Sequence, residues 1–175
     1  ENWNGSSWTE VGDLNTTRRS TTSSGTTTAA IAAGGGNAPL TTLYANVESW
    51  NGSAWTEVGD LNEARAQVSG AGIQTSALAY GGLNPSDSAT GKTEQWNGSA
   101  WTETGDLSQV RRQHQGGGAS ANSAISMSGY SDTANVASVE TFSANAPVGA
   151  WSTGGTINTA RSTGKGAGTT SAGLI

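Results

Sequence analysis

Cysteine is absent from this 175-residue sequence, and histidine and methionine occur once each. Without cysteine there are no disulfides and no thiolate metal sites. His114, in the segment Arg-Arg-Gln-His-Gln, has no second histidine or cysteine with which to build a metal site or a catalytic triad. The sequence therefore predicts a protein that is not an enzyme and that uses no cofactor and no metal.

Basic residues and long apolar runs are also scarce. Only 8 residues are lysine or arginine and the net charge is -5, so no basic patch can follow a phosphate backbone and no nucleic-acid partner is expected. No run of about 18 apolar residues is present, which argues against membrane insertion. The N-terminus shows no basic-then-apolar signal segment.

Large apolar side chains are few, and the apolar residues amount to 33% of the chain. We expect a core made of seven tryptophans, a few aliphatic residues and closely packed small residues. A repeat array allows this, because each unit buries one face on its neighbour. Low-complexity disorder is the competing interpretation. The regular tryptophan spacing argues against it.

A motif occurs three times and then in a degenerate form. Glu-x-Trp-Asn-Gly-Ser-x-Trp spans residues 1–8, 48–55 and 94–101, and a weaker copy runs from Glu140 to Trp151. The second tryptophan recurs at intervals of 47, 46 and 50 residues, which suits four-stranded propeller blades or two-helix repeats. The Asn-Gly pairs indicate tight hairpin turns, and no window has helical apolar spacing. The sequence predicts an all-β fold.

Each unit contains further landmarks at fixed spacing. An arginine follows the second tryptophan by ten residues in all four units. A short small-apolar run then ends in glycine, and a variable segment leads to the next Glu-x-aromatic motif. We predict four strands per unit: one after the arginine, one ending at the glycines, one ending at the first aromatic residue, and one from the second tryptophan to Gly-Asp-Leu. Repeated radially, such units form a β-propeller.

The order of these landmarks resembles the kelch repeat. The resemblance rests on the glycine doublets at 34–35 and 81–82, the following Val-Glu-x-aromatic or Thr-Glu-x-aromatic segment, the tryptophan and the arginine. It covers the whole chain and implies a β-propeller of four-stranded kelch-like blades. Two departures stand out: Ser128-Gly129 replaces the doublet in the third unit, and the Ser143–Ala150 turn of the last unit is four residues longer.

We interpret residues 1–175 as one propeller domain or fragment. It divides into a half blade at 1–14, blades at 15–61, 62–107 and 108–157, and a partial blade at 158–175. Both ends interrupt a predicted strand, so we expect an incomplete portion of a larger ring, with six to eight blades by resemblance to the family. The alternative is a four-blade ring in which the two partial blades combine.

Variation between units predicts where ligands bind. The variable segments are 36–46, 83–92, 130–138 and 143–150. Since loops vary where scaffolds do not, we expect binding there. The candidate binding residues are Asn37, Leu40, Tyr44, Asn84, Asp87, Tyr130, Asp132, Asn145 and Val148.

The residues that repeat are predicted to be structural. An even loop places the two aromatic residues of each motif on one sheet face, where they would fill the space between blades; the alternative is a platform for sugar rings. The arginines would hydrogen-bond carbonyls or pair with Glu48, Glu94 and Glu140; the alternative is a ligand-binding ring around a central channel. The structural set is Trp3, Trp8, Trp50, Trp55, Trp96, Trp101, Phe142, Trp151, Arg18, Arg65, Arg111 and Arg161.

For function, we expect a non-enzymatic structural or adhesive protein displayed outside a cell or on a virion. In its low charge, its lack of cysteine and its near-identical units, the chain resembles kelch-like arrays of bacteriophage and bacterial surface proteins. The expected role is a phage fibre, tail or decoration component in a homo-oligomeric or larger assembly, with a glycan or another virion or surface protein as partner. The alternatives are a carbohydrate-active propeller enzyme completed by residues outside this sequence, and an intracellular kelch adaptor.

Overall fold

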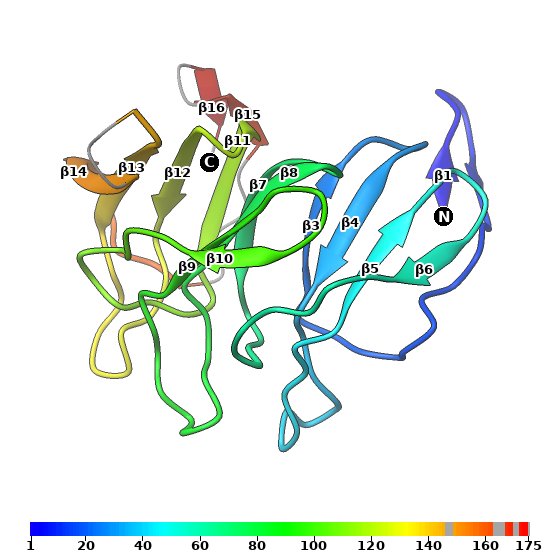
Figure 1. The fold of residues 1–175 in the computed structure, drawn as a ribbon. Helices are drawn as coiled ribbons and strands as arrows, with labels where there is room; N and C mark the ends of the chain where they lie inside the picture. The colour runs from blue at the N-terminus through cyan, green and yellow to red at the C-terminus, as the bar shows by residue number, and fades with distance from the viewer. Residues whose placement is uncertain (146–148, 163–166, 170–171, 175) are drawn as a thin grey trace.

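The computed structural model describes residues 1–145, 149–162, 167–169 and 172–174, and its regular secondary structure consists of β-strands (Figure 1). The predicted all-β fold is confirmed. Within this described part of the chain, no helix is long and apolar enough to cross a membrane.

The strands form three four-stranded antiparallel sheets and two hairpins. Each sheet follows chain order, so the predicted succession of four strands per unit is confirmed. The first sheet contains β3 (Thr22–Gly25), β4 (Ala30–Ala33), β5 (Val47–Trp50) and β6 (Trp55–Glu57). The second contains β7 (Ser69–Ile73), β8 (Ser76–Tyr80), β9 (Thr93–Trp96) and β10 (Trp101–Glu103). The third contains β11 (Gln115–Ser120), β12 (Ser123–Met127), β13 (Ser138–Ser143) and β14 (Ala150–Thr156). The hairpins are β1 (Asn2–Trp3) with β2 (Trp8–Thr9), and β15 (Ala167–Thr169) with β16 (Ala172–Leu174).

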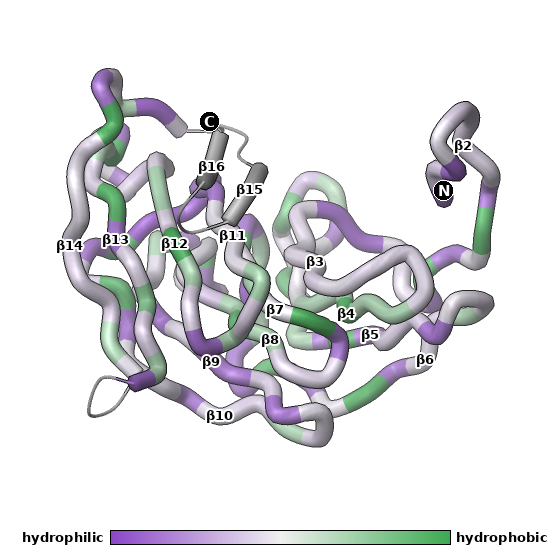
Figure 2. Tube along the Cα trace, turned by 90° about the horizontal axis from the view of Figure 1, so that it is seen from above, coloured by the Kyte–Doolittle hydropathy of each residue, from purple (hydrophilic) through white to green (hydrophobic). Residues whose placement is uncertain are grey.

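The first strands of successive sheets lie side by side. β3 lies beside β7, β7 beside β11, and β11 beside β15. Seen from above, β3, β7 and β11 lie towards the middle of the molecule, and β6, β10 and β14 lie at its periphery (Figure 2). This arrangement is compatible with a propeller. The sheets of the described residues do not close into a ring.

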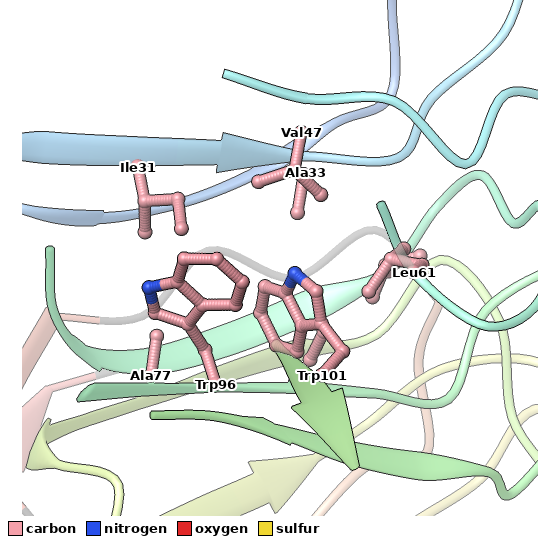
Figure 3. Packing of buried hydrophobic residues seen from close by; sticks show 9 residues of the cluster. Ile31, Ala33, Val47, Leu61, Ala77, Trp96 and Trp101 are labelled. Carbon is pink, nitrogen blue, oxygen red and sulfur yellow. The ribbon is translucent and has the colours of Figure 1, made fainter. Parts of the chain in front are cut away.

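The core lies between neighbouring sheets. Ile31, Ala33 and Val47 of the first sheet face the rings of Trp96 and Trp101 of the second (Figure 3). A second buried cluster joins the second sheet to the third through Tyr80, Phe142 and Trp151, among others. Small residues allow the close approach: a side chain at Gly116 would collide with the Tyr80 hydroxyl. The expected core of tryptophans and small residues is therefore present.

The Asn-Gly pairs form the predicted hairpin turns. In the second motif, the Asn51 backbone N–H donates to the Ala54 carbonyl (3.3 Å), and the Asn51 side-chain oxygen accepts from the Ser53 and Ala54 N–H groups. Gly52 has φ +97°, a conformation that side chains disfavour. The turn places Trp50 directly opposite Trp55, as even loop length predicts. The motif therefore sets the register of β5 and β6.

The Gly-Asp-Leu segments do not belong to the fourth strand, which corrects the prediction. β6 and β10 end at the glutamates, two residues before the glycine. In the Gly59-Asp60-Leu61 segment, Gly59 lies against the Trp96 ring. In the equivalent segment of the next unit, Gly105-Asp106-Leu107, Asp106 accepts a hydrogen bond from the Thr93 N–H (2.9 Å). Gly-Asp-Leu thus caps the start of the third strand instead of extending the fourth.

Ser128 takes the place of the first glycine of a doublet and adopts its conformation. Gly34 and Gly81 have φ of +66° and +63°, and Ser128 has φ 60°. The second residue of each doublet, for example Gly82, donates its N–H to the carbonyl of the next unit's arginine, here Arg111 (2.9 Å). A side chain at Gly81 would lie 2.5 Å from the His114 ring, which explains the glycine there. Ser128 itself is buried and its hydroxyl has no partner among the described residues.

Candidate functional site

The three variable segments that link second and third strands emerge at one end of the molecule. These loops, residues 36–46, 83–92 and 130–138, lie along the lower edge in Figure 1. Their bases are held alike, because the residue after each repeated arginine bridges to the start of the loop. These bridges are Arg19–Gly36, Ala66–Leu83 and Arg112–Tyr130. A common scaffold therefore presents three different loops side by side.

Asparagines organise the first two loops. The Asn37 side-chain oxygen accepts from the Thr42 N–H (2.9 Å), and the Asn84 side-chain oxygen accepts from the Ser86 and Ser88 N–H groups (3.0 and 3.1 Å). Such Asx interactions fix loop conformation. Both asparagines, predicted to bind a ligand, therefore use their side-chain oxygens within the loop.

Leu40 and Tyr44 lie at different depths of the first loop. Leu40 lines a groove between the loops and has φ 77°. Tyr44 is half-buried at the loop base, where its carbonyl accepts from the Arg65 N–H (3.2 Å). Of these two residues, Leu40 is the one placed to touch a ligand.

A charged cluster joins the second and third loops. Arg112 lies 2.8 Å from Asp132 and 3.6 Å from Asp87, whose side chain is 89% exposed. The Arg112 guanidinium also lies over the Tyr130 ring, 5.6 Å from its centroid. Asp132 accepts a further hydrogen bond from the Ala89 N–H (2.5 Å). Three predicted binding residues, Asp87, Tyr130 and Asp132, thus meet around Arg112, which is not among the residues predicted from the sequence.

A groove of about 490 Å³ separates the first and second loops. Its walls combine polar and apolar surface, and Asn84, Thr41 and Asp87 supply side-chain polar groups. The apolar lining residues are Pro39, Leu40, Leu43, Leu83 and Pro85. Three of the predicted residues, Leu40, Asn84 and Asp87, therefore line a common concave surface.

The described residues of the fourth candidate loop do not line this groove. Asn145 is exposed in a turn that follows β13. Val148, and with it part of the 143–150 segment, lies outside the described residues.

The repeated arginines are tied into the scaffold. Arg18, Arg65 and Arg111 form buried ion pairs with Glu48, Glu94 and Glu140, at 3.0, 2.6 and 2.6 Å. These are the pairs considered from the sequence.

Arg65 shows the full set of contacts. It donates to the carbonyls of Gly81 (3.1 Å) and Lys92 (2.7 Å), and the other oxygen of Glu94 accepts from the Asn62 backbone and side chain. Both terminal guanidinium nitrogens of Arg65 and both carboxylate oxygens of Glu94 are thereby engaged within the scaffold. Arg161, by contrast, is exposed.

The aromatic pairs divide by environment. Trp50, Trp96, Trp101, Phe142 and Trp151 are buried. The partly buried Trp55 donates its indole N–H to the Gly12 carbonyl (3.1 Å). Trp3 and Trp8 are 46% and 64% exposed, and their rings lie 5.5 Å apart. The buried members contribute to the packing between sheets.

His114 is a buried neutral side chain between the second and third sheets. It precedes β11, whereas the sequence placed it on the first strand of its unit; Gln113 adopts φ 53° and turns the chain there. Its Nε2 lies 3.1 Å from the Tyr80 carbonyl and therefore donates, and its Nδ1 accepts from the Ser126 hydroxyl (3.0 Å). Burial, reinforced by Arg111, lowers the pKa of His114 from 6.5 to about 3.

This lowered pKa predicts an acid-dependent loss of stability. Between pH 6.5 and 3 the unfolded chain binds a proton at His114 that the folded chain does not, so stability falls as the pH falls through this range. The slope is about 1.4 kcal/mol per pH unit, and the loss reaches roughly 4 kcal/mol by pH 3. We expect His114→Gln to remove this component, measured as unfolding free energy in urea at pH 7, 5 and 4. Equal pH slopes for both proteins would contradict the assignment.

The described residues contain no cluster of three or more histidine, cysteine or acidic side chains that could hold a metal ion. No family model matches the chain, and no curated protein matches it either.

Proposed function

We propose that this chain is part of a kelch-like β-propeller that serves as a non-enzymatic binding module. Three four-stranded sheets with adjacent first strands support the propeller. The repeat landmarks support the kelch assignment. The 15–61, 62–107 and 108–157 segments would each be one blade.

One observation carries the binding role. The first three repeated arginines, their glutamates and most repeated aromatic side chains are engaged inside the scaffold, whereas three of the four variable segments gather at one end. There the first two loops line the groove of about 490 Å³, and the Arg112 cluster ties the second loop to the third. Rigid scaffolds that present variable loops are a common design for recognition.

We further propose that the module is displayed outside the cell or on a virion, as a fibre, tail or decoration component within a larger assembly. Low charge, absence of cysteine and the near-identical repeats support this role. Its ligand would be a surface glycan or another virion or surface protein.

The binding role can be tested with the recombinant chain on an array of bacterial surface polysaccharides and on immobilised host-cell envelopes. We expect binding without release of new reducing ends. Replacing residues 38–42 and 85–87 by Gly-Ser segments, which keeps the organising asparagines, should weaken the binding while the fold persists. Hydrolysis of a polysaccharide, or binding that both replacements leave unchanged, would contradict the proposal. Immunogold labelling of virions with an antibody to the chain tests the location.

A further inference from the structure

We propose that a second cleft, formed where the first strands begin, binds a neutral sugar. This inference goes beyond the proposed function by naming a second site, distinct from the loop groove, and its ligand class. The cleft encloses about 290 Å³ and is lined by Ser20, Thr21, Gln67, Gln113, His114 and Gln115, with Val68 on one wall.

The repeat itself brings these residues together. Ser20, Gln67 and Gln113 each stand two residues after a repeated arginine, and all three have left-handed backbone conformation, with φ of 59°, 56° and 53°. This turn begins the first strand of each sheet. The Gln67 N–H donates to the Ser20 carbonyl (2.8 Å), which ties the first and second turns together. Three sheets thus contribute the same position to one cleft.

The cleft continues along the first strands. An adjoining hollow of about 370 Å³ shares Thr21, Val68, His114 and Gln115 with it and extends to Ser69 and Gly116. Small-ligand pockets usually measure roughly 300–1,000 Å³, so the two hollows are of a size suited to a sugar.

The lining combines apolar surface with uncharged polar groups. Among the residues that the structure describes, no lysine, arginine, aspartate or glutamate lines the cleft. The nearby Arg65 and Arg111 are already paired with Glu94 and Glu140. Both nitrogens of His114 are hydrogen-bonded, and the ring is neutral near pH 7. A charged ligand would find no counter-ion here, and its desolvation would be uncompensated.

Hydroxyl-rich ligands match the groups that remain. Glutamine amides and the hydroxyls of Ser20 and Thr21 can both donate and accept hydrogen bonds. The Gln67 side-chain oxygen is buried and has no hydrogen-bond partner among the described residues. Because that oxygen is closed to solvent, a ligand in the cleft would meet the amide N–H group of Gln67.

The test compares sugars and glutamine variants. Binding of glucose, galactose, mannose and N-acetylglucosamine is measured by titration calorimetry, and binding of neutral and sialylated oligosaccharides is measured on an array. Comparison of the two assays shows whether the site takes a free monosaccharide or the end of a glycan chain. We expect binding of at least one neutral sugar. Gln67→Leu and Gln113→Leu should each weaken it about tenfold or more, since each variant loses hydrogen bonds. Gln95→Leu, a change on β9 outside the cleft, is the matched control and should bind as the parent does.

Thermal unfolding of each variant checks that the fold persists, and the Gln113 variant keeps the test valid if Gln67→Leu fails to fold. Absence of neutral-sugar binding, preference for sialylated glycans, or unchanged affinity in both glutamine variants would overturn the sugar site. If binding is lost on loop replacement but not in the glutamine variants, the loop-based function stands and this inference fails.

Discussion

Replacing Arg65 by methionine should lower the free energy of unfolding by about 3–5 kcal/mol. The change leaves the Glu94 carboxylate buried without its cation, and it removes donors from the carbonyls of Gly81 and Lys92. The size of the effect reflects an uncompensated buried charge more than the net worth of the pair. Urea unfolding followed by circular dichroism measures it.

The matched control lies in the same unit. Lys92 pairs with Glu63 at 3.3 Å, but both side chains are partly exposed, so Lys92→Met should cost no more than about 1 kcal/mol. We also expect the Arg65→Met/Glu94→Met double variant to lose less than the sum of the two single losses, because neither charge is then left alone. Similar losses for Arg65→Met and Lys92→Met would show that the buried pair contributes no more to the free energy of unfolding than the exposed pair does.

The scaffold could be predicted from the sequence because the residues that pack or pair within each unit recur at constant spacing. The ion pair between Arg65 and Glu94 joins two landmarks that recur at constant spacing, so one unit predicts the next. Likewise, the Asn-Gly turn fixes the register that places Trp96 opposite Trp101. These features depend on local spacing within a unit, which the sequence displays directly.

The binding surfaces could be predicted only in part. The loops were recognised by their variation, but Arg112 was missed because its partners, Asp87 and Asp132, occupy two different loops and do not repeat. The sequence marks Arg112 only weakly, because the residue after the repeated arginine is not constant: it is Arg19, Ala66 and Arg112 in the three units.

The glutamine cleft was missed for a different reason. Ser20, Gln67 and Gln113 do recur two residues after the arginine, but their side chains differ. Only the packing of β3, β7 and β11 side by side places them at one cleft. A contact between units depends on the rotation from sheet to sheet, which spacing within a unit does not reveal.

Trp101→Ala should be the second large loss, about 3–5 kcal/mol. The indole is 6% exposed and belongs to the cluster that includes Val47 and Leu61, so its removal opens a cavity between two sheets. Its indole N–H has no hydrogen-bond partner among the described residues, so the loss is one of packing. Trp101→Phe, which keeps an aromatic ring, should lose much less.

Trp8 is a control at the same motif position. It is 64% exposed, and its ring contacts Trp3, so Trp8→Ala should cost less than about 1 kcal/mol. The comparison holds residue type, hairpin turn and register constant; the Trp8 hairpin differs in that, among the described residues, no further strands pair with it and no neighbouring sheet covers the ring. Unfolding free energies from urea titrations of the two alanine variants measure the difference. Equal losses would mean that the motif stabilises its own hairpin and contributes little between sheets. A loss confined to Trp101→Ala would identify sheet-to-sheet packing as the reason that the tryptophan repeats.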